Sequence, residues 1–153
     1  MGSSSSALPP LPVVDGAAAG DADETGGAPR PLRLFLVEDS PAVRERLVDF
    51  LVEAGRIEFV GFAETEADAV RQLNGLDVDV AIVDLNLREG TGIGVIEAVR
   101  ATQPAPPPTI VVLTNYAFPE FANACRQRGA DYFFDKSTQF GAVKSLLDAI
   151  RRA

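Results

Sequence analysis

The stretch "LRLFLVEDSPAV", residues 32–43, joins an apolar run to two adjacent acids and then to the start of a helix. The run has the length and the apolar character of a short β-strand. Ser40 is a favourable N-cap, and Pro41 is favourable as the first residue of a helix. One acid would be enough to mark the turn between them. The pair Glu38 and Asp39 therefore needs an explanation from elsewhere in the chain.

The same strand–helix pattern recurs four more times. Short connections between alternating strands and helices predict a parallel sheet with helices on both faces. The fold class is therefore expected to be α/β, a doubly wound three-layer sandwich with a five-stranded parallel sheet. The remaining strands are expected at 57–64, 78–84, 109–114 and 131–134, and the helices at 41–54, 65–75, 93–102, 119–128 and around 143–150.

Two of these helices are predicted with a specific apolar stripe. The fourth helix should carry Phe121, Cys125 and Arg128 on one stripe and end before Gly129. The first helix should end at Gly55. Its stripe, read at helical spacing, contains Val43, Leu47, Phe50, Leu51 and Ala54.

Residues 1–31 consist mostly of Gly, Ala, Pro, Ser and acids. Such a segment buries too little apolar surface to offset the entropy of ordering, so we expect a disordered tail followed by one domain at 32–153. The tail lacks the basic and apolar regions of a signal peptide, and no later run of the sequence has the length of a membrane span. We therefore expect a cytoplasmic protein without membrane insertion.

The net charge is −8, and the chain has one cysteine and no histidine. An acidic domain is poorly suited to phosphate backbones, which argues against nucleic acid as a direct partner. Cys125 has no second cysteine for an internal disulfide and suits a reducing compartment. The lack of histidine excludes Ser-His-Asp and Cys-His sites and histidine-based metal sites.

Polar residues stand where four of the predicted strands end. They are Glu38 and Asp39, Asp84, Thr114 and Lys136. The carboxyl ends of parallel strands share one edge, where open α/β sheets bind their ligands. Two like charges about 4 Å apart repel by roughly 4 kcal/mol at an effective dielectric near 20, and Mg²⁺ relieves such repulsion. A carboxylate in this setting can attack phosphorus, while an ammonium and a hydroxyl stabilise the phosphoryl oxygens.

On these residues the chain resembles the receiver domains of two-component response regulators. The resemblance covers 32–153 and rests on "VED" at 37–39, "VDLNL" at 83–87, "VVLT" at 111–114 and "FFDKS" at 133–137. It implies a flavodoxin-like sheet of order 2-1-3-4-5. It also implies that Asp84 accepts a phosphoryl group from a histidine of a sensor kinase or phosphotransfer protein.

The resemblance implies further roles around Asp84. Mg²⁺ would be held by Glu38, Asp39, Asp84 and the backbone carbonyl of Asn86. Asn86 also stands at a position that tunes dephosphorylation in the family, as does Tyr116. We expect Tyr116 to shield the phosphoryl group from water and to lengthen its lifetime.

The switch that the family uses would involve Thr114 and Lys136, which bind the phosphoryl group, and Phe133, which turns inward. The face made by helix 119–128, strand 131–134 and the last helix would then change shape. That face would bind an unidentified downstream protein, and the resemblance also allows a homodimer through it.

Several positions depart from the family pattern or match it in a specific way. Arg88 stands where a proline often follows the phosphoacceptor by four residues. Asn115 stands where the family usually has a small residue, and its larger side chain could crowd access to the phosphoryl group. Ser137 replaces a frequent proline. Gly92 matches the family's usual glycine eight residues after the acceptor.

The expected function is a single-domain response regulator, because no output domain follows the last predicted helix in this sequence. It would be a stoichiometric phosphoacceptor and not an enzyme. One alternative is a phosphate sink or phosphorelay shuttle without a target of its own. Another is a Mg²⁺-dependent phosphatase-like enzyme, which is disfavoured because Asn86 stands where such enzymes place a second acid.

Overall fold

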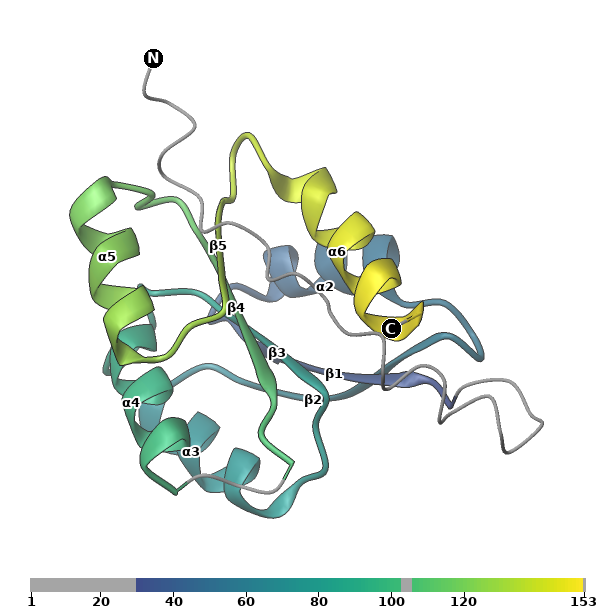
Figure 1. The fold of residues 1–153 in the computed structure, drawn as a ribbon, viewed down its shortest axis with the longest axis horizontal. Helices are drawn as coiled ribbons and strands as arrows, with labels where there is room; N and C mark the ends of the chain where they lie inside the picture. Colours follow the sequence, from purple (N-terminus) through teal and green to yellow (C-terminus); the bar gives the residue numbers. More distant parts are fainter. Residues whose placement is uncertain (1–29, 103–105, 153) are drawn as a thin grey trace.

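The computed structural model describes residues 30–102 and 106–152, and it shows a sheet between two helical layers (Figure 1). Nearly all of the tail expected at 1–31, and part of the proline-rich linker, lie outside the described residues. The strands are β1 (Leu32–Val37), β2 (Ile57–Ala63), β3 (Val80–Val83), β4 (Thr109–Thr114) and β5 (Tyr132–Asp135). The helices are α2 (Pro41–Leu51), α3 (Glu66–Gly75), α4 (Gly92–Thr102), α5 (Pro119–Arg128) and α6 (Phe140–Arg152).

The five strands are all parallel and lie in the order β2-β1-β3-β4-β5. This confirms the predicted flavodoxin-like sandwich. The winding direction reverses between β1 and β3, so the loops that follow these two strands leave toward opposite faces of the sheet. In open α/β sheets such a reversal point is where ligands bind.

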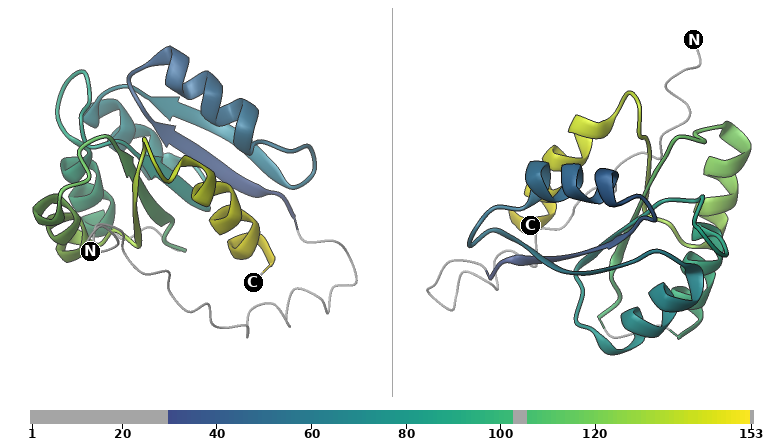
Figure 2. Two further views of the ribbon diagram at one scale, coloured as in Figure 1. Left: turned by 90° about the horizontal axis from the view of Figure 1, so that it is seen from above. Right: turned by 180° about the vertical axis from the view of Figure 1, so that it is seen from behind.

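The two helical layers are α3, α4 and α5 on one face and α2 and α6 on the other (Figure 2). Each layer encloses its own apolar cluster against the sheet. β3 is buried at all four positions, because a central strand is covered on both faces. In the last helix Val143 and Leu147 are buried, whereas Leu146 and Ile150 are only partly buried.

Most helix ends follow the predicted signals. The Ser40 hydroxyl accepts the Val43 N–H over 3.2 Å, and the Thr65 hydroxyl accepts the Asp68 N–H over 3.2 Å. Gly129 closes α5 with a φ of 114°, a left-handed conformation that favours glycine.

The predicted end of the first helix is wrong. Helix α2 stops at Leu51, before the expected end at Gly55. Gly55, with a φ of 79°, lies in a tight turn instead. The flanking residues Glu53 and Ile57 exchange two main-chain hydrogen bonds, of 3.1 and 2.9 Å. These bonds return the chain directly into β2, which leaves no room for another helical turn.

Both predicted stripes are also partly wrong. Phe50 of α2 is 43% exposed, and its ring lies 5.5 Å from that of Phe140 instead of in the core. In α5 the buried residues are Ala122 and Cys125, and Phe121 is exposed. Ala122 faces the sheet, so Phe121, which precedes it by about 100° around the helix, faces outward.

Cys125 is fully buried, and burial raises the pKa of its thiol to about 11. It therefore packs as a small hydrophobic residue and not as a thiolate. Arg128, the third member of the predicted stripe, is exposed and pairs with Glu97 of α4 over 2.8 Å. In the described ranges, no helix combines the length and the apolar character needed to cross a bilayer.

Gly92 begins α4 at a place where the chain passes close to itself. Its N–H donates to the Leu85 carbonyl over 3.0 Å. A Cβ at this position would lie 2.2 Å from the main-chain oxygen of Asp84, which real side chains do not tolerate. The glycine therefore allows the loop after β3 to fold back over the end of the strand.

We predict that Gly92→Ala lowers the free energy of unfolding by about 1–3 kcal/mol, because the methyl group forces the Asp84 main chain to move. The control is Gly141→Ala, since nothing lies within 4 Å of a Cβ there and helical alanine is favoured over glycine by up to about 1 kcal/mol. Urea denaturation measures both variants. Equal effects of the two substitutions would contradict the steric argument.

Candidate functional site

The loops after β1, β3, β4 and β5 meet at the carboxyl edge of the sheet. Main-chain hydrogen bonds extend the ladder one residue past the strands. The Asp84 N–H donates to the Val37 carbonyl over 3.0 Å, and the Lys136 N–H donates to the Thr114 carbonyl over 2.8 Å. These bonds fix the points from which the side chains of Asp84 and Lys136 extend.

Lys136 connects two carboxylates that come from different strands. Its Nζ donates to Glu38 Oε1 over 2.9 Å and to Asp84 Oδ2 over 3.0 Å. The side chains of Lys136, Glu38 and Asp84 are only 11%, 5% and 9% exposed. Charge-assisted hydrogen bonds with so little access to water hold both carboxylates in a defined orientation.

Asp39 completes a cluster of three acids. One carboxylate oxygen from each of Glu38, Asp39 and Asp84 lies within 4.8 Å of the others. The remaining oxygen of Glu38, Oε2, accepts the Ser40 N–H over 3.1 Å. Three carboxylates beside one ammonium leave net negative charge on hard oxygen atoms, and this donor set fits Mg²⁺.

The electrostatics of the site shift two pKa values. Burial raises the pKa of Glu38 above its ordinary value of 4.5, although Lys136 beside it acts in the opposite direction. Burial by itself lowers the pKa of Lys136, but the neighbouring Asp84 and Glu38 outweigh it, and the pKa is raised above 10.5. Lys136 therefore stays charged at neutral pH and can bind an anionic group.

The site opens into a cavity of about 200 Å³. It is polar and small, which suits a phosphoryl group with a metal ion and not a nucleotide. Asn86 from the loop after β3 and Asn115 and Tyr116 from the loop after β4 form part of its wall. The other residues that line it are Glu38, Asp39, Ser40, Val43, Asp84 and Lys136.

Thr114 and Phe133 lie behind this wall. Thr114 is fully buried, and its Oγ1 accepts the Tyr116 N–H over 3.1 Å. Phe133 is fully buried in the apolar cluster under α3, α4 and α5. Neither residue is among the described residues that line the cavity.

Sequence reasoning missed Arg44 of α2 and Glu64, which follows β2. An Arg44 nitrogen donates to the main-chain oxygen of Glu38 over 2.7 Å and to Glu64 Oε2 over 2.9 Å. The sequence carries little signal for these contacts, because one acceptor is a main-chain carbonyl and Glu64 follows a strand at the edge of the sheet.

Comparison with known proteins agrees with this geometry. The family model of the response regulator receiver domain matches residues 34–149. An uncharacterized transcriptional regulatory protein of Bacillus subtilis, YhcZ, is 32% identical over 108 residues, which make up 71% of this chain and 50% of that protein. The protein-glutamate methylesterase/protein-glutamine glutaminase 5 of Myxococcus xanthus is 34% identical over 108 residues, covering 71% of this chain and 31% of that protein.

Among solved structures, the signal receiver domain of the response regulator NarL from Mycobacterium tuberculosis is 30% identical, with a TM-score of 0.70. The similarity covers 79% of this chain and 97% of that structure. The chain spans half or less of the two curated relatives, so their whole-protein activities do not pass to it by similarity. The match over most of the described residues shows that the chain belongs to the receiver domain family of two-component response regulators.

Proposed function

We propose that this chain is a phosphorylation-controlled switch in which Asp84 accepts the phosphoryl group. The observation that carries the proposal is the contact of Lys136 Nζ with Asp84 Oδ2 inside a small acidic cavity. Lys136 orients the carboxylate and supplies positive charge where phosphoryl oxygens would arrive. Within residues 30–102 and 106–152, the other oxygen, Asp84 Oδ1, has only a long hydrogen bond of 3.4 Å from the Asn86 N–H.

The phosphoryl donor would be a histidine that lies outside this sequence. Receiver domains interact with histidine kinases or phosphotransfer proteins, and this chain contains no histidine. In the proposed transfer an oxygen of Asp84 forms a bond to phosphorus, and the bond from phosphorus to the partner's imidazole nitrogen breaks. The electron pair of that bond stays on the imidazole, and the aspartyl phosphate remains on this chain.

Glu38, Asp39 and Asp84, with the backbone carbonyl of Asn86, would hold Mg²⁺. When bound, the ion would supply positive charge beside the transferring group and relieve the repulsion between the carboxylates. Lys136 alone cannot relieve the repulsion between the carboxylates, because its single positive charge is accompanied by three negative ones.

The conformational response needs more than one contact. Shifting a two-state population from 1:99 to 99:1 takes about 5.5 kcal/mol, whereas one hydrogen bond to a charged group contributes about 1.5–3 kcal/mol. Thr114 would donate its hydroxyl hydrogen to a phosphoryl oxygen, and its Oγ1 accepts the Tyr116 N–H in this conformation. The Phe133 side chain is already fully buried in this conformation. An inward turn of its ring would therefore bury no additional apolar surface.

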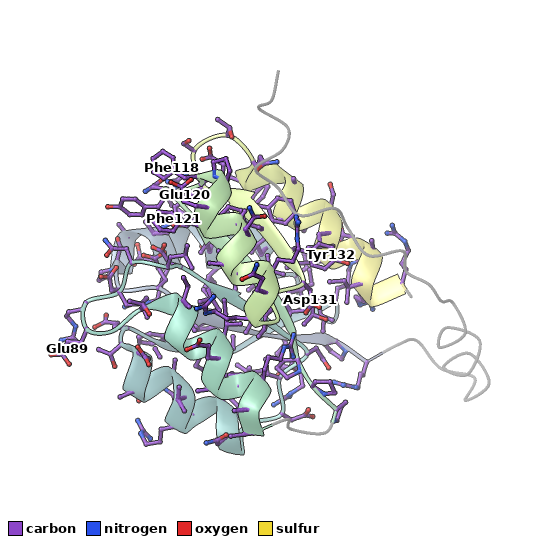
Figure 3. All side chains as sticks on the ribbon, turned by 60° about the vertical axis from the view of Figure 1, so that its left-hand side comes forward. Glu89, Phe118, Glu120, Phe121, Asp131 and Tyr132 are labelled. Atoms are coloured by element: carbon purple, nitrogen blue, oxygen red, sulfur yellow. The ribbon has the colours of Figure 1, made fainter. Side chains whose placement is uncertain are left out.

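The face proposed to bind a target consists of α5, β5 and α6. At the start of α5, Phe118 and Phe121 are 52% and 37% exposed, and their ring centroids lie 5.9 Å apart (Figure 3). Exposed aromatic pairs suit a protein contact better than solvent. Because Tyr116 joins the cavity to this end of α5, a change at the cavity has a short path to the aromatic pair.

We favour a switch with its own target over a phosphate sink because of this exposed pair. Capture of a partner only by the phosphorylated chain would support the switch, and phosphoryl passage to a second protein without such capture would support the sink. We propose no turnover of external substrates, since Asn86 offers an amide where a phosphatase-like enzyme needs a second acid.

The proposed acceptor is tested with acetyl phosphate and Mg²⁺. The intact protein should gain one phosphoryl group by mass spectrometry. Asp84→Asn should abolish the gain, because an amide oxygen is a poor nucleophile toward phosphorus. Asp49→Asn, the same chemical change at an exposed position of α2, should leave it intact. Phosphorylation that persists in Asp84→Asn would contradict the assignment.

Tyr116, which is 45% exposed and lines the cavity, is predicted to exclude water from the phosphoryl group. Tyr116→Ala should speed hydrolysis of the aspartyl phosphate several-fold, because water gains access to phosphorus. Tyr116→Phe keeps the ring and should decay like the wild type. The decay of the phosphorylated mass after removal of acetyl phosphate measures this, and an unchanged or slower decay of Tyr116→Ala would reject the shielding role.

The affinity for Mg²⁺ should depend on pH through Glu38. A proton on Glu38 competes with the metal, and the raised pKa of Glu38 extends that competition above 4.5. The affinity should therefore increase as the pH rises through the folded-state pKa. Glu38→Gln replaces the carboxylate by a neutral amide that does not titrate in this range. The variant should therefore bind Mg²⁺ more weakly, because a negative ligand is lost, and should show a flatter pH profile in calorimetric titrations. Parallel pH profiles for the two proteins would exclude Glu38 as the titrating ligand.

A further inference from the structure

Arg44 is a nearly buried cation that the proposed chemistry does not use. Its side chain is 14% exposed and extends from α2 toward the end of β1. The same nitrogen donates to the Glu38 carbonyl over 2.7 Å and to Glu64 Oε2 over 2.9 Å. The guanidinium carbon lies 4.1 Å from the centroid of the Phe62 ring. Three different partners therefore hold this guanidinium in place.

The contact with Glu38 fixes the main chain that carries two of the proposed metal ligands. On its amide side, Glu38 is held by β2, because its N–H donates to the Ala63 carbonyl over 3.0 Å. On its carbonyl side, the partner is Arg44. The peptide that Arg44 holds is the one between Glu38 and Asp39. Its orientation determines where the Asp39 carboxylate starts.

Glu64 extends this arrangement to the second ligand-bearing loop. Its Oε1 lies 3.4 Å from a terminal nitrogen of Arg88, and its main-chain oxygen accepts the Arg88 N–H over 3.4 Å. Arg88 is four residues past Asp84, at the position where a proline is frequent in the family. The Glu64 carboxylate thus lies between two guanidinium groups, one beside Glu38 and one on the loop after Asp84.

We propose that Arg44, held by Glu64, is a positioning residue for the metal-binding carboxylates and thereby sets the affinity for Mg²⁺. Arg44 acts through the Glu38 carbonyl and contacts neither the metal nor the phosphoryl group. The inference rests on the proposed function insofar as the acidic cluster is taken to hold Mg²⁺.

Charge repulsion and ligand positioning lead to opposite results for Arg44→Met. A guanidinium beside the acidic cluster repels an incoming cation, so its removal alone would tighten metal binding. Loss of a group that orients ligands typically weakens metal affinity by about 10–100-fold. The sign of the change in metal affinity therefore separates the two explanations. A merely structural role of Arg44 would leave the metal affinity of the folded protein unchanged.

The test titrates the full chain with Mn²⁺, follows the free ion by electron paramagnetic resonance, and then displaces it with Mg²⁺. Arg44→Met should raise the Kd for both ions by about ten-fold or more. Arg44→Lys should lie between the wild type and Arg44→Met, because an ammonium can reach the same oxygens. Arg46→Met is the matched control, since Arg46 is on the same helix, stacks on Phe140 at 4.9 Å, and forms no ion pair with Glu38, Asp39 or Asp84 in the described part of the chain.

Unchanged or tighter binding by Arg44→Met would overturn the inference. If Arg44→Met does not fold, as judged by circular dichroism, Glu64→Gln is compared with Glu45→Gln. The second variant removes the same charge from the residue that follows Arg44 on α2. Weaker binding only for Glu64→Gln that persists at high salt, where charge effects between separated groups are screened, supports positioning. Equal effects of the two variants, or an effect that salt removes, overturn it. A wild-type chain that binds neither ion would instead defeat the metal site of the proposed function, and this outcome is distinct from wild-type binding that Arg44→Met leaves intact.

Discussion

The ammonium of Lys136 lies between the buried carboxylates of Glu38 and Asp84, and the arrangement of the carboxyl edge depends on this contact. Without it, two acids with little access to water would face each other. Removing one partner of a buried ion pair typically costs about 3–5 kcal/mol, because the remaining charge is left uncompensated. The same ammonium also supplies the positive charge that a phosphoryl group requires. One contact therefore serves both the fold and the proposed chemistry.

The strand order explains how residues so far apart in the sequence reach this contact. Lys136 is separated from Glu38 by 98 positions and from Asp84 by 52. β1 and β3 are neighbours at the centre, and β4 separates them from β5. The long apolar stem of Lys136 spans this distance while its charged end reaches the acids. The loops after β1 and β3 carry the acidic cluster. A metal ion at this cluster would act on both loops, as would the Arg44–Glu64 pair beside it.

The sequence was sufficient for the sheet, because the strands are short and mostly apolar, and residues such as Ser40 and Thr65 mark the start of the helices that follow. It was also sufficient to place acids, Thr114 and Lys136 at strand ends. It failed for α2, whose end is decided by the turn at Gly55, and for Phe121, since the small Ala122 faces the sheet in its place. It could not show Arg44, because a contact with a main-chain carbonyl leaves no pattern in the side chains. Nor could it show that Thr114 is turned toward Tyr116.

The central claim is that Lys136 and Asp84 interact directly in the folded chain. A double-mutant cycle with Lys136→Met, Asp84→Asn and the combined variant, measured by urea denaturation without metal, tests it most directly. The account predicts that the two changes are coupled by at least about 1 kcal/mol, since each single change leaves a buried charge less well paired. Free energies that add within about 0.5 kcal/mol would show that the two side chains do not meet, and the account would be contradicted.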